Sequence, residues 1–228
     1  MLLALGVGGY LYLQLDDEIR RFAEATIAKQ YPDMAVSVGS AGYAPGRGVS
    51  LFDIRVACRG DESAAEPVLT ISELRLIGEF DLRRLAAGTH RLNRIEVRRP
   101  ALRAVRDASG VWNCQSLWPP PDTGGTPPPI TIANATLVVS DLAPPSSVAR
   151  RPLTVRNINI DIKPTEPAAG QSAGQSAGQP AGQPGTGLTI LGSVEGALAK
   201  SFRLEGRVSP NKDTLEISVD AEQLHVTD

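Results

Sequence analysis

The sequence predicts a mainly β protein, in which an N-terminal membrane-anchor helix precedes a strongly twisted antiparallel β-sheet with an apolar groove face and few short helices. After residue 34, apolar and polar residues alternate with the period of two that is typical of strands. Glycine and proline, 22 and 18 of the 228 residues, mark many turns. Before residue 34 the pattern is helical, which places the long helix at the N-terminus.

Residues 2–15 form an uncharged run with one polar residue, Gln14. As a helix this run reaches about 21 Å, short of the roughly 30 Å hydrocarbon core of a bilayer. No basic residue precedes it and no signal-peptide cleavage pattern follows it. We interpret the run as an uncleaved anchor whose first residues are missing, and the alternative is a buried helix of a soluble domain.

Residues 16–30 predict an amphipathic helix, since their apolar side chains recur at helical spacing. Acids at 16–18 fit its first turn, and Pro32 ends it. The anchor can continue into this helix without a break. The expected apolar face consists of Ile19, Phe22, Ala23, Thr26, Ile27 and Gln30.

Four parts are therefore expected: an anchor and amphipathic helix at 1–30, a first β segment at 34–118, a proline-rich connection at 119–129, and a second β segment at 130–228. The first segment also predicts a short helix at 80–87 and a hairpin turn at 107–110, from which residues 111–117 return as a strand. Residues 164–187 carry Ala-Gly-Gln repeats without large apolar side chains and predict a disordered loop.

The apolar positions change parity inside several predicted strands. In 48–58 they shift from odd to even numbers between Leu51 and Ile54, and in 66–77 between Ile71 and Leu74. One extra residue in a strand reverses the facing of everything after it. We therefore expect β-bulges and a strongly twisted sheet.

The last three strands alternate most regularly and indicate an antiparallel meander with one apolar face. Either the sheet curls on itself, or a second sheet covers this face, or the face stays open for an apolar partner. The candidates for lining such a groove are Ile190, Val194, Leu204, Val208, Leu215, Ile217 and Val219.

Composition excludes more chemistries than it supports. The sequence has two cysteines and two histidines, and it contains no recognised nucleotide-binding or hydrolase motif. We therefore expect no catalytic site, metal site or cofactor. Cys58 and Cys114 read as small buried hydrophobic residues, with a disulfide left open. The net charge is −2, yet nine arginines and three acids between residues 75 and 106 give +6 locally. That stretch fits phosphate attraction or, alternatively, a solvated sheet face balanced by acids elsewhere.

Residues 48–117 carry motifs in a recognisable order: a strand with Gly-x-x-Leu-x-x-Ile, a short helix, a strand that ends in proline, and Arg-Asp-x-x-Gly-x-x-Asn. This order resembles the N-terminal region of the AsmA-like family, which includes the TamB-type envelope proteins. The residues that carry the resemblance, with structural roles expected, are Gly48, Leu51, Ile54, Pro100, Arg106, Asp107, Gly110 and Asn113.

The resemblance implies a repeating β-groove, or β-taco, anchored in the inner membrane and projecting into the periplasm. It implies a role in outer-membrane biogenesis by phospholipid transport along the groove. The implied partners are phospholipid acyl chains, the inner membrane and other envelope proteins, with no nucleic acid. The main alternative is a non-enzymatic structural or protein-interaction module, and an enzyme is a third possibility. An apolar face open to solvent favours the groove, and a second sheet over that face favours the module.

Overall fold

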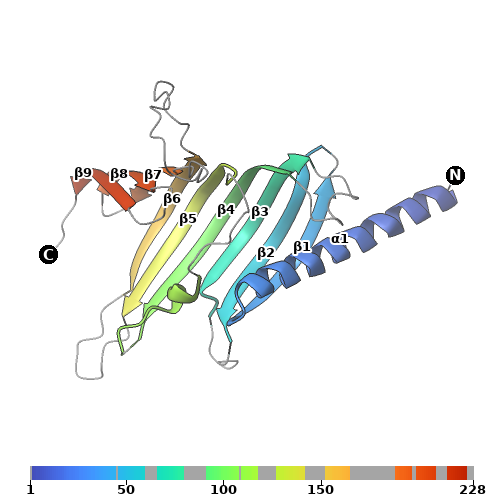
Figure 1. Ribbon diagram of the computed structural model, residues 1–228, viewed down its shortest axis with the longest axis horizontal. Helices are drawn as coiled ribbons and strands as arrows, with labels where there is room; N and C mark the ends of the chain where they lie inside the picture. Colours follow the sequence, from blue (N-terminus) through green and yellow to red (C-terminus); the bar gives the residue numbers. More distant parts are fainter. Residues whose placement is uncertain are drawn as a thin grey trace, which may run out of the picture.

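The computed structural model confirms a mainly β fold, with a single twisted sheet, one long helix and a short 3₁₀ helix in the described part of the chain (Figure 1). The structure describes residues 2–44, 46–59, 66–79, 91–107, 109–117, 127–141, 152–164, 188–196, 199–208 and 215–224. The elements are α1 (Leu2–Gln30), β1 (Met34–Ala44), β2 (Gly48–Cys58), β3 (Leu69–Glu79), β4 (Arg91–Arg106), η1 (Asn113–Leu117), β5 (Ile130–Asp141), β6 (Leu153–Pro164), β7 (Leu188–Gly196), β8 (Ala199–Val208) and β9 (Leu215–Leu224).

The sheet is mixed, so the expectation of a wholly antiparallel sheet is wrong. Its nine strands lie in the order of the sequence, and β4 and β5 are parallel neighbours while every other pair is antiparallel. Two parallel strands need a crossover connection, because the chain must return to the end from which the first strand started. The expected returning strand at 111–117 is accordingly absent: Trp112 forms one isolated bridge to Arg106, and η1 follows.

The parity switch expected in 48–58 has a local geometric cause that recurs on three further strands, although the described residues of β3 include no such conformation. Asp53, Arg99, Asn134 and Asn157, one each on β2, β4, β5 and β6, have φ between 48° and 56°. We call these four residues the bend row. A left-handed residue reverses which face its successors point to, and among residues other than glycine, asparagine and aspartate tolerate this conformation best.

The expected bulges are found only in part. On either side of Asp53 the pairing of β2 with β1 and β3 continues in one register, without an extra residue. Between β5 and β6, in contrast, the register shifts around Ala135. β4 runs as one strand through Pro100, directly after Arg99 of the bend row.

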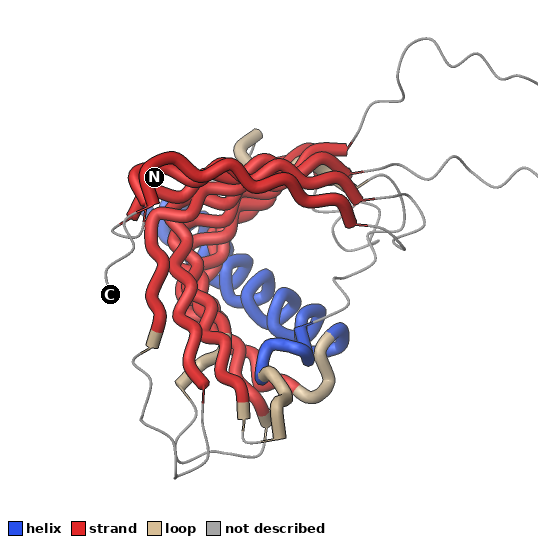
Figure 2. The backbone as a smooth tube through the Cα atoms, turned by 90° about the vertical axis from the view of Figure 1, so that its left-hand side faces the viewer, coloured by secondary structure: helices blue, strands red, loops and turns tan. Residues whose placement is uncertain are grey.

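The bend gives the sheet two arms that meet at a corner, with α1 lying inside the corner (Figure 2). Side chains of α1, β1 and β2 form the buried core beneath the helix. This core consists of Ile19, Met34, Val38, Val49, Leu51, Ile54 and Val56. Leu117 of η1 packs against it from a different element.

Helix α1 is continuous, so the predicted anchor and the amphipathic helix form one element. Its acids at 16–18 therefore lie in mid-helix and not in a first turn. Ile19 and Ala23 face the core as expected, but Phe22 is 55% exposed and does not. No helix within the described residues is both long enough and apolar enough to cross a membrane, so the expectation of a membrane-spanning anchor is not supported.

Some expectations concern residues outside those described. These are the short helix at 80–87, most of the proline-rich connection at 119–129, and the Ala-Gly-Gln loop, of whose predicted range only Pro164 is described. Pro164 is the last residue of β6.

Candidate functional site

Apolar side chains of successive strands stand directly opposite one another and form rows across the sheet. Paired residues in neighbouring strands project to the same face. Row 1 follows the pairs Val49, Leu76, Ile95, Ile130, Ile162, Ile190, Gly206 and Ile217. Row 2 follows Leu51, Leu74, Val97, Ile132, Ile160, Gly192, Leu204 and Val219. The two rows define what we call the apolar face, which extends from β2 to β9.

By strand register, the seven candidates predicted to line a groove belong to rows 1 and 2 or to positions that continue them, and their role in lining a groove stays a prediction. Ile190 and Ile217 belong to row 1, and Leu204 and Val219 to row 2. Val194 pairs with Ile158 and Phe202, and Val208 pairs with Leu188 and Leu215. The register of the backbone therefore brings the C-terminal meander onto the same face as the buried residues of β2.

Coverage of the apolar face changes along its length. Beneath α1, Val49 is 4% exposed and Leu51 is 2% exposed. From β3 to β7 the same two rows are only half-buried, as at Leu74, Ile95 and Ile160. The described strands form a single sheet, and none of them belongs to a second layer. The face is thus closed at its β1 end and less covered beyond it.

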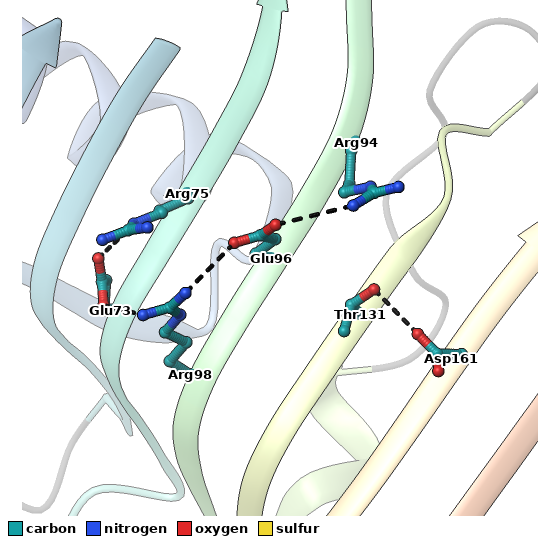
Figure 3. A network of polar contacts seen from close by, with 7 residues as sticks. All are labelled: Glu73, Arg75, Arg94, Glu96, Arg98, Thr131 and Asp161. Carbon is teal, nitrogen blue, oxygen red and sulfur yellow. Dashed lines mark hydrogen bonds and ion pairs between the residues drawn. The ribbon is translucent and has the colours of Figure 1, made fainter. Parts of the chain in front are cut away.

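The opposite side of the sheet, which we call the charged face, carries a chain of ion pairs (Figure 3). Glu73 pairs with Arg75 on the same strand and with Arg98 across on β4. Arg98 continues to Glu96, and Glu96 to Arg94. Glu73 and Arg75 alternate with Leu74 along β3, which places them opposite row 2.

The arginine-rich stretch therefore contributes to a charged face balanced by acids, at least at Arg75, Arg94 and Arg98. Farther along this face Thr131 donates a hydrogen bond to Asp161 at 2.9 Å. Glu73 is only 8% exposed, and a carboxylate at that depth needs the two guanidinium partners that it has. These arginines do not line the apolar face.

The residues that carry the family resemblance have identifiable structural roles at the start of the sheet. Gly48 has φ +99°, and a Cβ there would lie 2.0 Å from the carbonyl oxygen of Leu76, so only glycine fits. Leu51 and Ile54 lie in the core on either side of the bend. Pro100 is buried directly after Arg99 of the bend row.

The second half of the motif builds the turn after β4. The carboxylate of Asp107 accepts hydrogen bonds from the hydroxyl and amide of Ser109 and from the amide of Val111. These hydrogen bonds lower the pKa of Asp107 below its usual range, and the bond from the Ser109 hydroxyl has the largest effect. The guanidinium of Arg106 donates to the carbonyl oxygen of Gly110, which has φ +88°.

Asn113 fixes the chain that leaves this turn. Its side-chain oxygen accepts from the backbone amide of Val105 at 2.8 Å, and its amide nitrogen donates to the carbonyl of Arg103 at 3.1 Å. One side chain thus satisfies the two backbone groups that a neighbouring strand would otherwise bond. This explains why η1 can replace the expected strand.

Reasoning from the sequence missed two hydrogen bonds that join α1 to the sheet. Glu24 accepts a hydrogen bond from the backbone amide of Val38 at 2.8 Å, and Asp16 accepts one from that of Tyr43 at 3.2 Å. Both amides belong to β1, the first strand of the sheet. The only signal in the sequence is the spacing of eight residues, which puts the two acids on one side of a helix.

The remaining candidates give no reactive centre within the described residues. Cys58 and Cys114 are both free and half-buried, so they are not joined in a disulfide. Cys58 packs against the core, as expected of a small hydrophobic residue. No group of histidine, cysteine and acidic residues in the described ranges is arranged to hold a metal ion.

Comparison with protein-family models gave no match, and comparison with curated proteins gave none either. The resemblance to the AsmA-like family therefore rests on the order of motifs in residues 48–117.

Proposed function

We propose that this protein binds phospholipid acyl chains along its apolar face and passes them along the sheet. The observation that supports this is the continuity of rows 1 and 2 from β2 to β9 on a face without a second sheet in the described part of the chain. With a strand spacing of about 4.8 Å, such rows are long enough to follow an extended acyl chain.

The physical chemistry of the face suits this role. Each methylene group removed from water contributes about 0.8 kcal/mol, so a bound chain needs no polar pocket. Rows 1 and 2 consist of leucine, isoleucine and valine with one glycine each and contain no charged residue, which leaves headgroups to the water beside the sheet. The role is non-enzymatic and requires no cofactor. Transport is therefore driven by a concentration gradient of the lipid or by a source of energy outside this protein.

The proposed setting follows from the resemblance to the AsmA-like family. We propose that the protein works in outer-membrane biogenesis, held at the inner membrane by its N-terminal segment with the sheet in the periplasm. A C-terminal fusion to a reporter that is active only outside the cytoplasm should then be active. Activity of a cytoplasm-only reporter at the same position would overturn this topology.

A second candidate function has one observation in its favour. Ile19 and Ala23 of α1 already pack on the apolar face, so this surface accepts an apolar protein helix. A structural or protein-interaction module of the cell envelope would use the same rows to bind a partner protein.

Photo-crosslinking at two adjacent residues of β7 separates the two candidates. Ile190 lies on the apolar face, whereas Leu191 points to the charged face and is 43% exposed. With a photo-reactive residue at position 190, the lipid-binding account predicts phospholipid adducts in cells, and position 191 is the matched control. Adducts at 190 that contain only protein, in a folded chain, would favour the interaction module.

A further inference from the structure

We propose that α1 closes the β1 end of the apolar face, so that acyl chains reach the face from the side, over β3 to β6, and not past β1. This inference rests on the lipid-binding function proposed above. It assigns to α1 the role of a cover that can be displaced, in addition to its place in the core.

The packing beneath α1 leaves no room for a ligand. Ile19 is 8% exposed, Val49 4% and Leu51 2%, and all three belong to one buried cluster. One strand farther, Leu76 and Leu74 continue the same rows but are only half-buried. A chain sliding along row 1 would meet α1 between β3 and β2.

Two polar contacts fasten α1 to the open edge of β1. We call them the edge bonds: the amide of Val38 donates to Glu24, and the amide of Tyr43 donates to Asp16. The two acids lie eight residues apart, about 12 Å along the helix. Both acceptors are side chains of α1, so they can be removed without touching the sheet itself.

The rest of the described contacts of α1 with the sheet are apolar, through side chains such as Ile19 and Ala23 that pack on the core. Glu24 and Asp17 form ion pairs with Arg20, which stay within the helix. The N-terminal half of α1 extends past β1, away from the sheet (Figure 1). Loss of the edge bonds should therefore loosen α1 while the pairing of the strands persists.

The experiment compares one position of row 1 with one position on β1, where the row is extended by strand pairing. Tyr43 pairs with Val49 and lies under α1, whereas Ile95 lies beyond it. A photo-reactive phenylalanine derivative replaces either residue in the full chain, and lipid adducts formed in cells are measured by mass spectrometry. The double variant Asp16→Ala/Glu24→Ala removes the edge bonds. Asp17→Ala/Arg20→Ala is the matched control, because it removes ion pairs of the same helix and leaves the edge bonds.

In the otherwise unaltered protein, lipid adducts are expected at position 95 and several-fold fewer at position 43. Loss of the edge bonds should raise the adducts at 43 to the level at 95, and the control should not. It should also speed hydrogen exchange of the Val38 and Tyr43 amides by about tenfold or more, since each amide loses a charged acceptor.

Three results would overturn the account, and they can be told apart. Equal adducts at 43 and 95 in the unaltered protein would show that α1 does not close the face. Unchanged exchange or unchanged adducts at 43 in the double variant would show that the edge bonds do not control access. No lipid adduct at 95 in any chain would instead refute the lipid-binding function itself, while the exchange measurement would still report on the edge bonds.

Discussion

Glu73 and Arg98 stand directly opposite each other on β3 and β4, with 3.7 Å between the Glu73 carboxylate and the Arg98 guanidinium. Glu73 also pairs with Arg75, so one nearly buried acid joins two half-exposed bases. Replacing Arg98 by alanine should lower the free energy of unfolding by about 1–2 kcal/mol, between the values for exposed and buried ion pairs.

The matched control for this prediction is Arg94→Ala at the exposed end of the same chain of ion pairs. Its contact with Glu96 measures 4.0 Å, and its side chain is 56% exposed. The cost should stay below about 0.5 kcal/mol. Equal effects of the two substitutions in urea denaturation would contradict the importance assigned to Glu73.

Gly48→Ala should be among the most destabilising single-methyl additions in the described sheet. The added Cβ would meet the carbonyl oxygen of Leu76, and φ at +99° disfavours any side chain. A loss of at least about 2 kcal/mol is expected, since left-handed conformation alone costs an L-residue about 1–2 kcal/mol. Gly42→Ala is the control, because its Cβ would have no neighbour within 4 Å. Thermal unfolding that fails to separate the two variants would refute this view of Gly48.

The turn at Asp107 should loosen in acid. Its hydrogen bonds lower the pKa of Asp107 in the folded protein below the ordinary value of 3.8. The stabilisation from the ionised form is therefore complete above that value and disappears as the pH falls through the lower, folded pKa. The amide signals of Ser109 and Val111 should report this titration by NMR. In Asp107→Asn they should be independent of pH in the same range, and a midpoint above 3.8 in the unaltered chain would contradict the assignment.

The bend row should tolerate glycine but not a β-branched residue. Asn134 has φ +56°, and its backbone amide donates to the side chain of Asn159. Asn134→Val should cost about 1–2 kcal/mol because valine avoids positive φ, whereas Asn134→Gly should stay within about 1 kcal/mol of the original. Comparable stabilities of the valine and glycine variants would show that the bend does not depend on this residue's conformation.

Much of the fold follows from local patterns in the sequence. The helix at 16–30 and the three C-terminal strands were predictable because their periods of 3.6 and two are regular. The parity change between Leu51 and Ile54 even located the bend, since its cause is a local backbone conformation at Asp53. What the pattern could not distinguish is an extra residue from a left-handed one.

The rest depends on contacts distant in the sequence. No local pattern in residues 111–117 indicates that the side chain of Asn113 forms hydrogen bonds with the backbone of β4 in place of a neighbouring strand. The parallel pairing of β4 and β5 was therefore missed. The edge bonds join residues 14 and 27 positions apart. The candidate apolar residues could be assigned to faces from the sequence, but their alignment into rows 1 and 2 needed the register.

The central claim, that the apolar face holds acyl chains, is tested most directly by measuring phospholipid bound to the purified full-length protein. The lipid extracted per chain is compared for the unaltered protein, for Ile132→Asp on the apolar face and for Leu191→Asp on the charged face, with circular dichroism to verify folding. The account predicts bound phospholipid in the unaltered protein and in Leu191→Asp, and a loss in folded Ile132→Asp. An unaltered protein that carries no phospholipid and takes none from phospholipid vesicles would contradict it.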